Sequence, residues 1–206
     1  MKSKYLSAAA ALLCVAGLAA CGGKGNGSIA LGVQVIGLDR AGLVLQNNGG
    51  DDLAINTAGN ANYSFKTLMA PDSPFNVTIK ATPANVTCKL ANNTGKINYY
   101  TYLQTTVTCT ADPYTLGGTV TSVAADGTAP EPLSADGLVL ANGAQTLAVA
   151  RGASTWQFAT PIGNQNVYGV TVLTQPTGQK CEVSKGTGTM PAQNVVDVVV
   201  TCKKTQ

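Results

Sequence analysis

Apolar and polar residues alternate along most of this chain, and that alternation predicts β-strands. From 75 to 81, Phe75, Val77 and Ile79 share one face, while Asn, Thr and Lys residues occupy the other. The same pattern recurs in four further segments, at 86–90, 103–109, 168–174 and 196–202. A period of two places neighbouring side chains on opposite faces of a sheet. We therefore expect strands with one face in a core and the other in solvent.

Turn-forming residues separate the predicted strands, and the clearest turns are NNGG at 47–50 and NG at 142–143. Turn signals recur roughly every 8–12 residues, and no amphipathic helical stretch lies between them. We expect about six or seven short strands in each ~90 residues, arranged as an antiparallel β-sandwich. A closed barrel is the alternative architecture.

The chain contains two copies of one domain. Three blocks recur at a constant offset of 93 positions: YSFKT at 63–67 with WQFAT at 156–160, FNVTIKATPANVTC at 75–88 with YGVTVLTQPTGQKC at 168–181, and TTVTC at 105–109 with VVVTC at 198–202. Matching blocks at one offset are the signature of a duplicated unit. We predict that copy one covers residues 29–113 and that copy two covers residues 114–206.

Four of the six cysteines lie in the repeat, and four cysteines allow three pairings. A domain copied whole carries its own bridge, so we predict disulfides Cys88–Cys109 and Cys181–Cys202. Each bridge should cross or staple the core, and closing a loop of about 22 residues should stabilise each copy by ~3 kcal/mol. Zinc-binding thiolates are disfavoured because no CxxC pair and no histidine accompany these cysteines.

The N-terminal segment resembles a bacterial lipoprotein signal. Two lysines precede an apolar run of about sixteen residues, which is short for a membrane-spanning helix of ~20. The run ends in LAAC at 18–21, which resembles a lipobox, and a Gly-rich polar stretch follows. The resemblance implies that residues 1–20 are a signal peptide and that Cys21 is lipidated. Gly22 stands where aspartate would favour the inner membrane, so the resemblance implies the outer membrane.

Composition and charge narrow the possible functions. Without the two lysines of the signal, eleven basic residues stand against ten acidic ones. This near-neutral balance argues against a nucleic-acid partner. Histidine is absent, which removes the commonest general base and the commonest metal ligand. No carboxylate pair stands in a recognisable catalytic frame, so we expect no enzyme activity, no cofactor and no metal.

The repeated unit carries a family resemblance in four motifs. These are GLVL at 42–45 with its following turn, YSF at 63–65, the alternating FNVTI at 75–79 and the paired-cysteine ending. They resemble immunoglobulin-like or transthyretin-like modules, which occur in tandem in bacterial surface lipoproteins and adhesin-like proteins. The resemblance implies two tandem β-sandwich domains that serve as stalks, spacers or binding units.

Three tyrosines stand out in copy one, because copy two has no aromatic residue at the corresponding place. They are Tyr99, Tyr100 and Tyr102. Tyr100 and Tyr102 share a parity opposite to that of Cys109, which predicts an exposed two-tyrosine platform beside the last strand. Aromatic platforms bind sugars and proteins. The alternative is cross-strand packing on the outer face of the sheet or against copy two.

Three weaker candidates have structural alternatives that we favour. Asp51 and Asp52 follow the 47–50 turn and offer oxygen ligands for Ca²⁺, but their spacing does not match an EF-hand, so a solvated hairpin is expected. The insertion at 124–137 in copy two is either a recognition loop or an ordinary lengthened loop. Trp156 aligns with a core position of copy one, so we expect it in the core of copy two.

These observations predict a non-catalytic, membrane-anchored lipoprotein of the outer membrane that acts as a structural or binding module. Residues 21–28 form a lipidated, flexible tether. The alternatives are an adhesin that binds carbohydrate or protein, and an accessory subunit of an envelope complex. The expected partners are the membrane, through the N-terminal lipid anchor, and a protein or glycan ligand. The sequence leaves open the face of the outer membrane and the oligomeric state.

Overall fold

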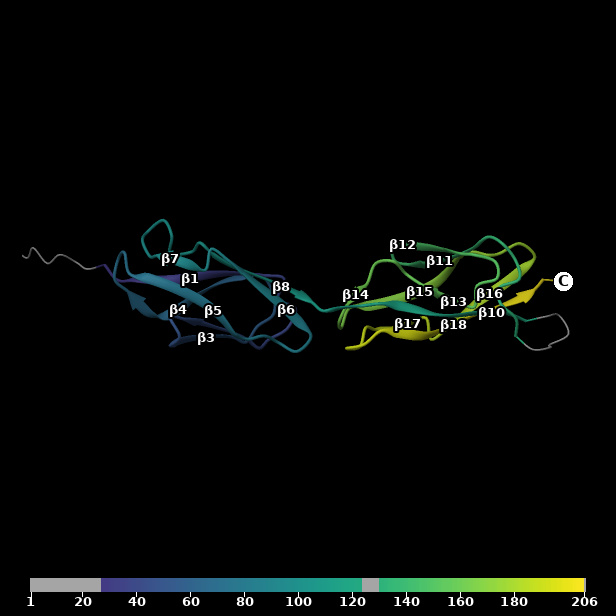
Figure 1. Ribbon diagram of the computed structural model, residues 1–206, viewed down its shortest axis with the longest axis horizontal. Coiled ribbons are helices and arrows are strands. Elements are labelled where there is room, and N and C mark those ends of the chain that lie inside the picture. Colours follow the sequence, from purple (N-terminus) through teal and green to yellow (C-terminus); the bar gives the residue numbers. More distant parts are fainter. Residues whose placement is uncertain (1–26, 124–129, 206) are drawn as a thin grey trace, which may run out of the picture.

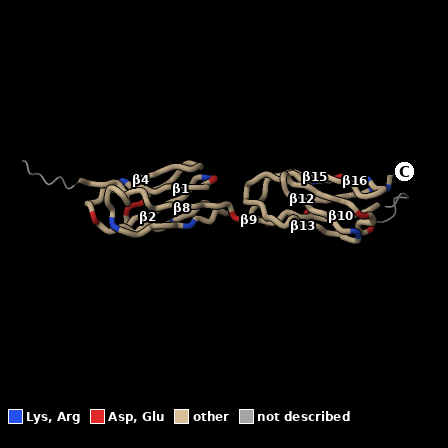
Figure 2. The backbone as a smooth tube through the Cα atoms, turned by 90° about the horizontal axis from the view of Figure 1, so that it is seen from above, with Lys and Arg blue, Asp and Glu red and all other residues tan. Residues whose placement is uncertain are grey.

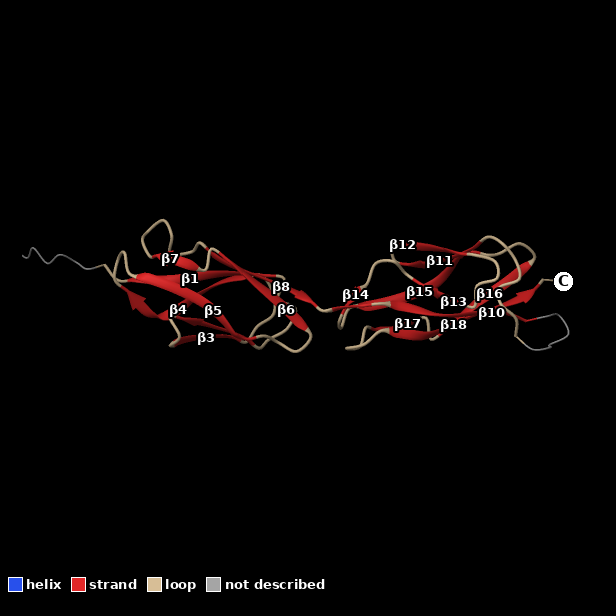
Figure 3. Ribbon diagram, in the orientation of Figure 1, coloured by secondary structure: helices blue, strands red, loops and turns tan. Residues whose placement is uncertain are grey.

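The computed structural model describes residues 27–123 and 130–205. Within these ranges the chain consists of strands, turns and loops, without a helix (Figure 3). No helix of the described residues qualifies as a membrane span. The strands form two sandwiches placed end to end along one long axis (Figure 1). The predicted signal peptide and most of the predicted tether lie outside the described residues.

Copy one is a sandwich of two four-stranded sheets. Its strands are β1 (Ile29–Ile36), β2 (Leu43–Asn47), β3 (Asp51–Ile55), β4 (Ala61–Met69), β5 (Pro74–Ala81), β6 (Val86–Ala91), β7 (Thr94–Lys96) and β8 (Thr105–Ala111). One sheet has the order β4-β1-β8-β6 and the other the order β3-β2-β5-β7. The two sheets are separate, which excludes the closed barrel.

Copy two repeats this arrangement with two added short strands. Its strands are β9 (Pro113–Tyr114), β10 (Leu116–Val123), β11 (Leu138–Asn142), β12 (Gln145–Val149), β13 (Thr155–Gln157), β14 (Ile162–Gly163), β15 (Val167–Thr174), β16 (Gln179–Ser184), β17 (Thr187–Thr189) and β18 (Val195–Lys204). The sheets have the orders β13-β10-β18-β16 and β12-β11-β15-β17, and β14 pairs with β9. The predicted all-β class with two tandem sandwiches is confirmed. The exact boundary at residue 113 stays a prediction, since β9 straddles it.

The first and last long strands of each copy are neighbours that run in the same direction. β1 pairs with β8 in parallel, and β10 pairs with β18 in parallel. The other strand pairs of the described residues are antiparallel, as expected. Because both strands of a parallel pair point the same way, the chain begins each copy at one end and leaves it at the other. We call these the leading end and the trailing end.

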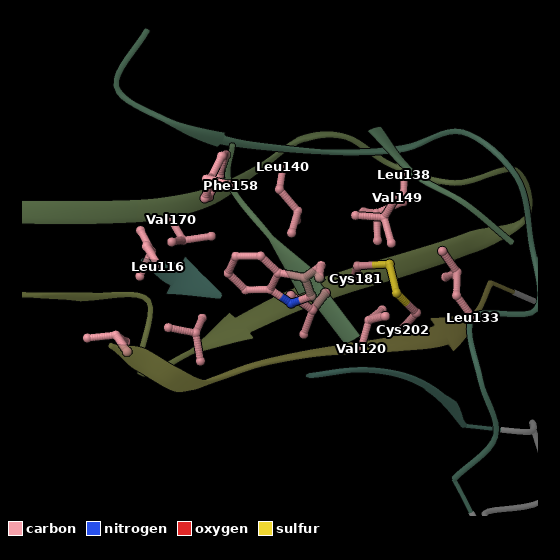
Figure 4. Close-up of a cluster of buried hydrophobic side chains, with 14 of the residues drawn as sticks. Leu116, Val120, Leu133, Leu138, Leu140, Val149, Phe158, Val170, Cys181 and Cys202 are labelled. Atoms are coloured by element: carbon pink, nitrogen blue, oxygen red, sulfur yellow. A yellow bond between two sulfur atoms is a disulfide. The ribbon is translucent and has the colours of Figure 1, made fainter. Parts of the chain in front are cut away.

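Each sandwich encloses its own core, made from the inward-facing positions of both sheets. In β8, Thr105, Val107 and Cys109 are buried while the intervening Thr108 is exposed, which confirms the predicted alternation. Burying a Val, Leu or Phe side chain completely contributes about 1.5–3 kcal/mol. The core of copy two, most of which Figure 4 shows, consists of Leu116, Val120, Leu133, Leu138, Leu140, Val149, Trp156, Phe158, Ile162, Val170, Cys181, Met190, Val195, Val198, Val200 and Cys202.

Trp156 belongs to this core, as its alignment with copy one predicts. Its indole Nε1 donates a hydrogen bond to the Thr119 carbonyl at 3.0 Å. Its ring meets Phe158 edge to face, with 5.6 Å between the ring centroids. The polar nitrogen is therefore satisfied inside the core, which is the usual condition for burying a tryptophan.

Both predicted disulfides are present. Cys88 lies opposite Cys109 on the neighbouring strands β6 and β8, and Cys181 lies opposite Cys202 on β16 and β18. The Cα atoms are 4.0 and 3.9 Å apart. Each bridge therefore staples the last strand of its copy to the edge strand of the same sheet. It does not cross from one sheet to the other, because both partners belong to one sheet.

The insertion predicted at 124–137 is only partly described, since residues 124–129 lie outside the described ranges. In the described part, Leu133 is 1% exposed and belongs to the core. Glu131 and Ser122 exchange backbone hydrogen bonds at 2.8 and 2.9 Å. This part packs onto copy two as a lengthened loop that closes its trailing end.

We expect the double variant Cys181→Ala/Cys202→Ala to lower the free energy of unfolding of copy two by about 3 kcal/mol, because the unfolded chain regains the freedom of the open loop. Urea unfolding followed by tryptophan fluorescence reports copy two alone, since Trp156 is the single tryptophan. The matched control, Cys88→Ala/Cys109→Ala, removes the bridge of copy one and should leave this transition unchanged. Equal shifts in both variants would contradict the independence of the two cores.

Candidate functional site

The trailing end of copy one meets the leading end of copy two at a polar junction. Arg40, between β1 and β2, donates from Nη1 to Oδ1 of Asn164 at 2.8 Å and from Nη2 to the Asn164 carbonyl at 3.1 Å. Asn164 is only 4% exposed. Its backbone N–H donates to the Asp112 carbonyl at 2.9 Å, and its side-chain amide donates to the Met190 carbonyl at 3.1 Å. A buried asparagine needs such partners, and here copy one provides several of them.

Asp39 fixes the guanidinium of Arg40 in this position. Nε and Nη2 of Arg40 donate to the two carboxylate oxygens at 3.0 and 2.8 Å, so the pair is bidentate. The hydrogen bond from Arg40 lowers the pKa of Asp39, and the same bond raises the pKa of Arg40. Bidentate arginine–carboxylate pairs add geometric specificity to their charge attraction. The pair therefore orients Arg40 toward copy two.

The connecting segment is itself part of the junction. β9 pairs with β14, so the two residues after Asp112 are held in a ladder with copy two. In the other direction, the Tyr114 hydroxyl donates to Oδ1 of Asn85 in copy one at 3.2 Å. Short β-pairing and a hydrogen bond on each side leave little freedom for a hinge.

Three of the tyrosines of copy one, Tyr99, Tyr100 and Tyr102, lie in a turn, because β8 begins only at Thr105. Asn98 organises the turn: its side-chain oxygen accepts from the N–H groups of Tyr100 and Thr101 at 2.8 and 3.1 Å. Its carbonyl accepts from the Tyr102 N–H at 3.0 Å. The parity argument from the sequence required an extended strand here, and it is wrong because the Asn98 side chain captures these amides instead.

The tyrosine side chains point largely into solvent. Tyr99 is 70% exposed, Tyr100 96% and Tyr102 45%. The turn connects β7 to the start of β8 and therefore lies at the leading end of copy one, on the far side from copy two (Figure 1). Packing against copy two is thereby excluded. The residues form an exposed aromatic surface on an ordered turn.

The two aspartates of the candidate calcium turn have protein partners. Asp52 pairs with Lys80 and accepts from Nε2 of Gln46 at 2.7 Å. The hydrogen bond from Lys80, followed by that from Gln46, lowers the pKa of Asp52. Asp51 accepts from the Thr67 N–H at 3.1 Å. Among the described residues, no group of three or more His, Cys, Asp or Glu side chains is placed to hold a metal ion.

A broad, open depression of about 560 Å³ lies on copy two near the junction. Tyr168 is the one titratable side chain among its described lining residues, which are otherwise neutral. Acid–base chemistry needs a titratable group within hydrogen-bond reach of a bound substrate, usually with a shifted pKa. This depression has the character of a shallow surface between loops.

Comparison with known proteins finds no matching family model and no curated relative. Solved structures with similarity include the Bacillus anthracis TIE protein, at 16% identity and TM-score 0.40, over 85% of this chain and 34% of that one. The pilus adhesin SpaC of Lactobacillus rhamnosus GG has 10% identity and TM-score 0.40, over 84% and 31%. The minor pilin GBS52 of Streptococcus agalactiae has 14% identity and TM-score 0.33, over 85% and 96%. The chain spans about a third of the length of the first two.

We expect Arg40→Ala to loosen the junction while both cores stay folded. The change removes two hydrogen bonds to the buried Asn164, and bonds from a charged group contribute about 1.5–3 kcal/mol each. ¹⁵N relaxation should then give the two copies separate rotational correlation times. Lys89→Ala, which removes an exposed lysine of the same copy, is the control. An Arg40→Ala variant whose copies tumble together as tightly as those of the unchanged chain would contradict this role of Arg40.

The junction should also loosen in acid. Arg40 lowers the pKa of Asp39 below its ordinary value of 3.8, so the pair contributes fully above that value. Its contribution is lost as the pH falls through the lowered pKa of the folded chain. The amide resonance of Asn164, followed from neutral pH downwards, should therefore stay in place until strongly acidic conditions. A change at mildly acidic pH would contradict this role of Asp39.

Proposed function

We propose that this chain is a non-catalytic protein of the cell envelope, held by a lipid on Cys21, whose two sandwiches form a stiff spacer. The observation that carries the proposal is the head-to-tail junction. Each copy begins at one end and leaves at the other, and the Arg40–Asn164 clamp fixes one copy onto the next. A spacer needs this arrangement, because it converts added domains into added length.

The chemistry of the cysteines supports a location outside the cytoplasm. Structural disulfides form and persist in oxidising compartments and are rare in the cytosol. Each copy carries one, on its last strand. The lipobox resemblance around Cys21 supports attachment of the N-terminal end of the spacer to a membrane. We propose the outer membrane as that membrane.

The dimensions and the surface also suit a spacer. Strands of eight to ten residues rise roughly 27–33 Å, so two stacked copies reach about 60 Å from their attachment point. Figure 2 shows the charged residues mainly toward the ends of the copies, with largely neutral flanks between them. Neutral polar flanks stay hydrated without attracting oppositely charged polymers.

A binding role is the second candidate, and the exposure of Tyr100 on an ordered turn favours it. The proposed ligands are a glycan or a protein, which aromatic side chains contact with flat apolar area and a hydrogen-bonding tip. The turn lies at the leading end of copy one, next to the proposed anchor. A ligand there would have to approach close to the membrane.

We expect mass spectrometry of the mature protein to find Cys21 as an acylated first residue, and Cys21→Ala to abolish acylation and release the chain from the membrane fraction. Stable anchoring takes more than one acyl chain. Cys14→Ala, within the predicted signal, is the matched control and should be processed normally. An unmodified amino end, or membrane retention of the Cys21→Ala chain, would contradict the proposed lipid anchor on Cys21.

A further inference from the structure

The leading ends of the two copies are built alike. Asp72 and Gln165 are 93 positions apart and both adopt positive φ, at 62° and 65°. The Asp72 N–H donates to the Ile97 carbonyl, and the Gln165 N–H donates to the Met190 carbonyl, each at 2.8 Å. The same turn therefore stands against the same loop in both copies. The contacts made by the leading end of copy two therefore indicate which contacts the leading end of copy one could make.

In copy two the leading end is a docking face, because Asn164 there receives Arg40 of copy one. The position equivalent to Asn164 in copy one, 93 residues earlier, is Pro71. At the trailing ends, buried Leu133 of copy two corresponds to buried Leu38 of copy one, which aligns Ala135 with Arg40. Neither half of the clamp recurs at the outer ends, so a further copy of this chain has no equivalent way to stack there.

The leading end of copy one instead carries an exposed apolar rim. Its members are the large exposed side chains around the start of β1, namely Leu68, Tyr99, Tyr100 and Tyr102. Leu68 lies beside β1 on β4, opposite Ala30. On the other side of β1, the Tyr102 carbonyl accepts from the Gly32 N–H at 2.6 Å.

The corresponding positions of copy two carry no aromatic residue. Tyr99 and Tyr100 correspond to Ala192 and Gln193 at the offset of 93, and Tyr102 corresponds to Val195, which is buried. The aromatic residues are therefore specific to the copy whose leading end has no other copy against it.

The chain that precedes copy one passes directly against this rim. A Cβ built on Gly27 would lie 2.7 Å from the hydroxyl of Tyr99. Cys21 is six residues before Gly27, and six residues span at most about 20 Å whatever their conformation. A lipid on Cys21 would thus hold the rim within that distance of a bilayer surface. Tyrosines are enriched at this depth because their rings are apolar and their hydroxyls are hydrated.

We propose that the rim is a membrane-contacting foot that seats in the headgroup region of a phospholipid bilayer. The inference rests on the proposed lipid anchor and adds a second contact to it. The lipid alone fixes one point, whereas the lipid and the rim together fix the direction in which copy one leaves the membrane. The junction then passes that direction on to copy two.

The test uses the full lipidated chain in phosphatidylcholine vesicles, with Trp156→Phe as background and Tyr100→Trp as probe. Lipids brominated on the upper acyl chain should reduce emission from position 100 at least about twofold, as for a tryptophan at the interface. Gln193→Trp is the matched control, at the equivalent exposed position of copy two, and its emission should not change. Flotation of the vesicles shows whether the chain is anchored.

Three outcomes would overturn the inference, and they separate its failure from that of the anchor. A chain that floats with the vesicles but shows equal emission from the Tyr100→Trp and Gln193→Trp variants refutes the foot and leaves the anchor standing. A chain with unmodified Cys21 that does not float refutes both. Glycan-array binding that disappears in Tyr100→Ala/Tyr102→Ala, without quenching by lipid, assigns the rim to a glycan instead.

Hydrogen exchange with Trp156 intact gives a second measurement, which does not depend on the tryptophan substitutions. Residues 98–104 should exchange more slowly in the vesicle-bound chain than in the unanchored Cys21→Ala chain. The matched segment 191–197 of copy two should exchange at the same rate in both. Equal hydrogen-exchange rates for residues 98–104 in the two chains would contradict the proposed membrane contact.

Discussion

The parallel hydrogen bonding between the first and last long strands of each copy determines the architecture of the whole molecule. In copy two this pairing brings β10 so close to β18 that a Cβ on Gly118 would lie 1.8 Å from the Val198 carbonyl oxygen. Only glycine allows that approach. Because the two strands run the same way, the chain leaves each sandwich opposite to where it began. The linear stack, the junction and the position of the aromatic rim all follow from that direction.

The junction between the two copies depends on a polar contact. Asn164 is buried, and a buried amide without partners would cost about 1–3 kcal/mol. Arg40 and the Asp112 carbonyl supply those partners across the seam. Proline and alanine occupy the corresponding outer positions, Pro71 and Ala135. Both copies therefore have the same fold, but only the trailing end of copy one and the leading end of copy two carry the residues of the junction.

Side-chain alternation and the offset of 93 predict the sandwiches, the cores and the cysteine pairing. Alternation marks the buried face within each strand, and the offset shows that each copy contains the same strands and the same pair of cysteines. The antiparallel prediction misses the parallel pairing of the first and last long strands of each copy, since alternation shows which face is buried but not which strand lies beside it. The tyrosine turn is missed because Asn98 and Thr101 compete with strand pairing; an asparagine with a threonine three residues later is a recognisable turn signal. Arg40 and Asn164 are 124 positions apart and have no spacing signature.

The direction of the paired strands also has a mechanical consequence. Tension applied between the leading end and the trailing end of copy one would pull β1 and β8 past one another lengthwise. Their ladder bonds, over Val33–Ile36 and Thr105–Thr108, would then carry the load together, whereas a hairpin pulled from one side breaks its bonds one at a time. If a copy did yield, the loop closed by Cys88 and Cys109 would stay shut and shorten the released length. The parallel pairing of the terminal strands therefore gives each copy resistance to stretching along its long axis.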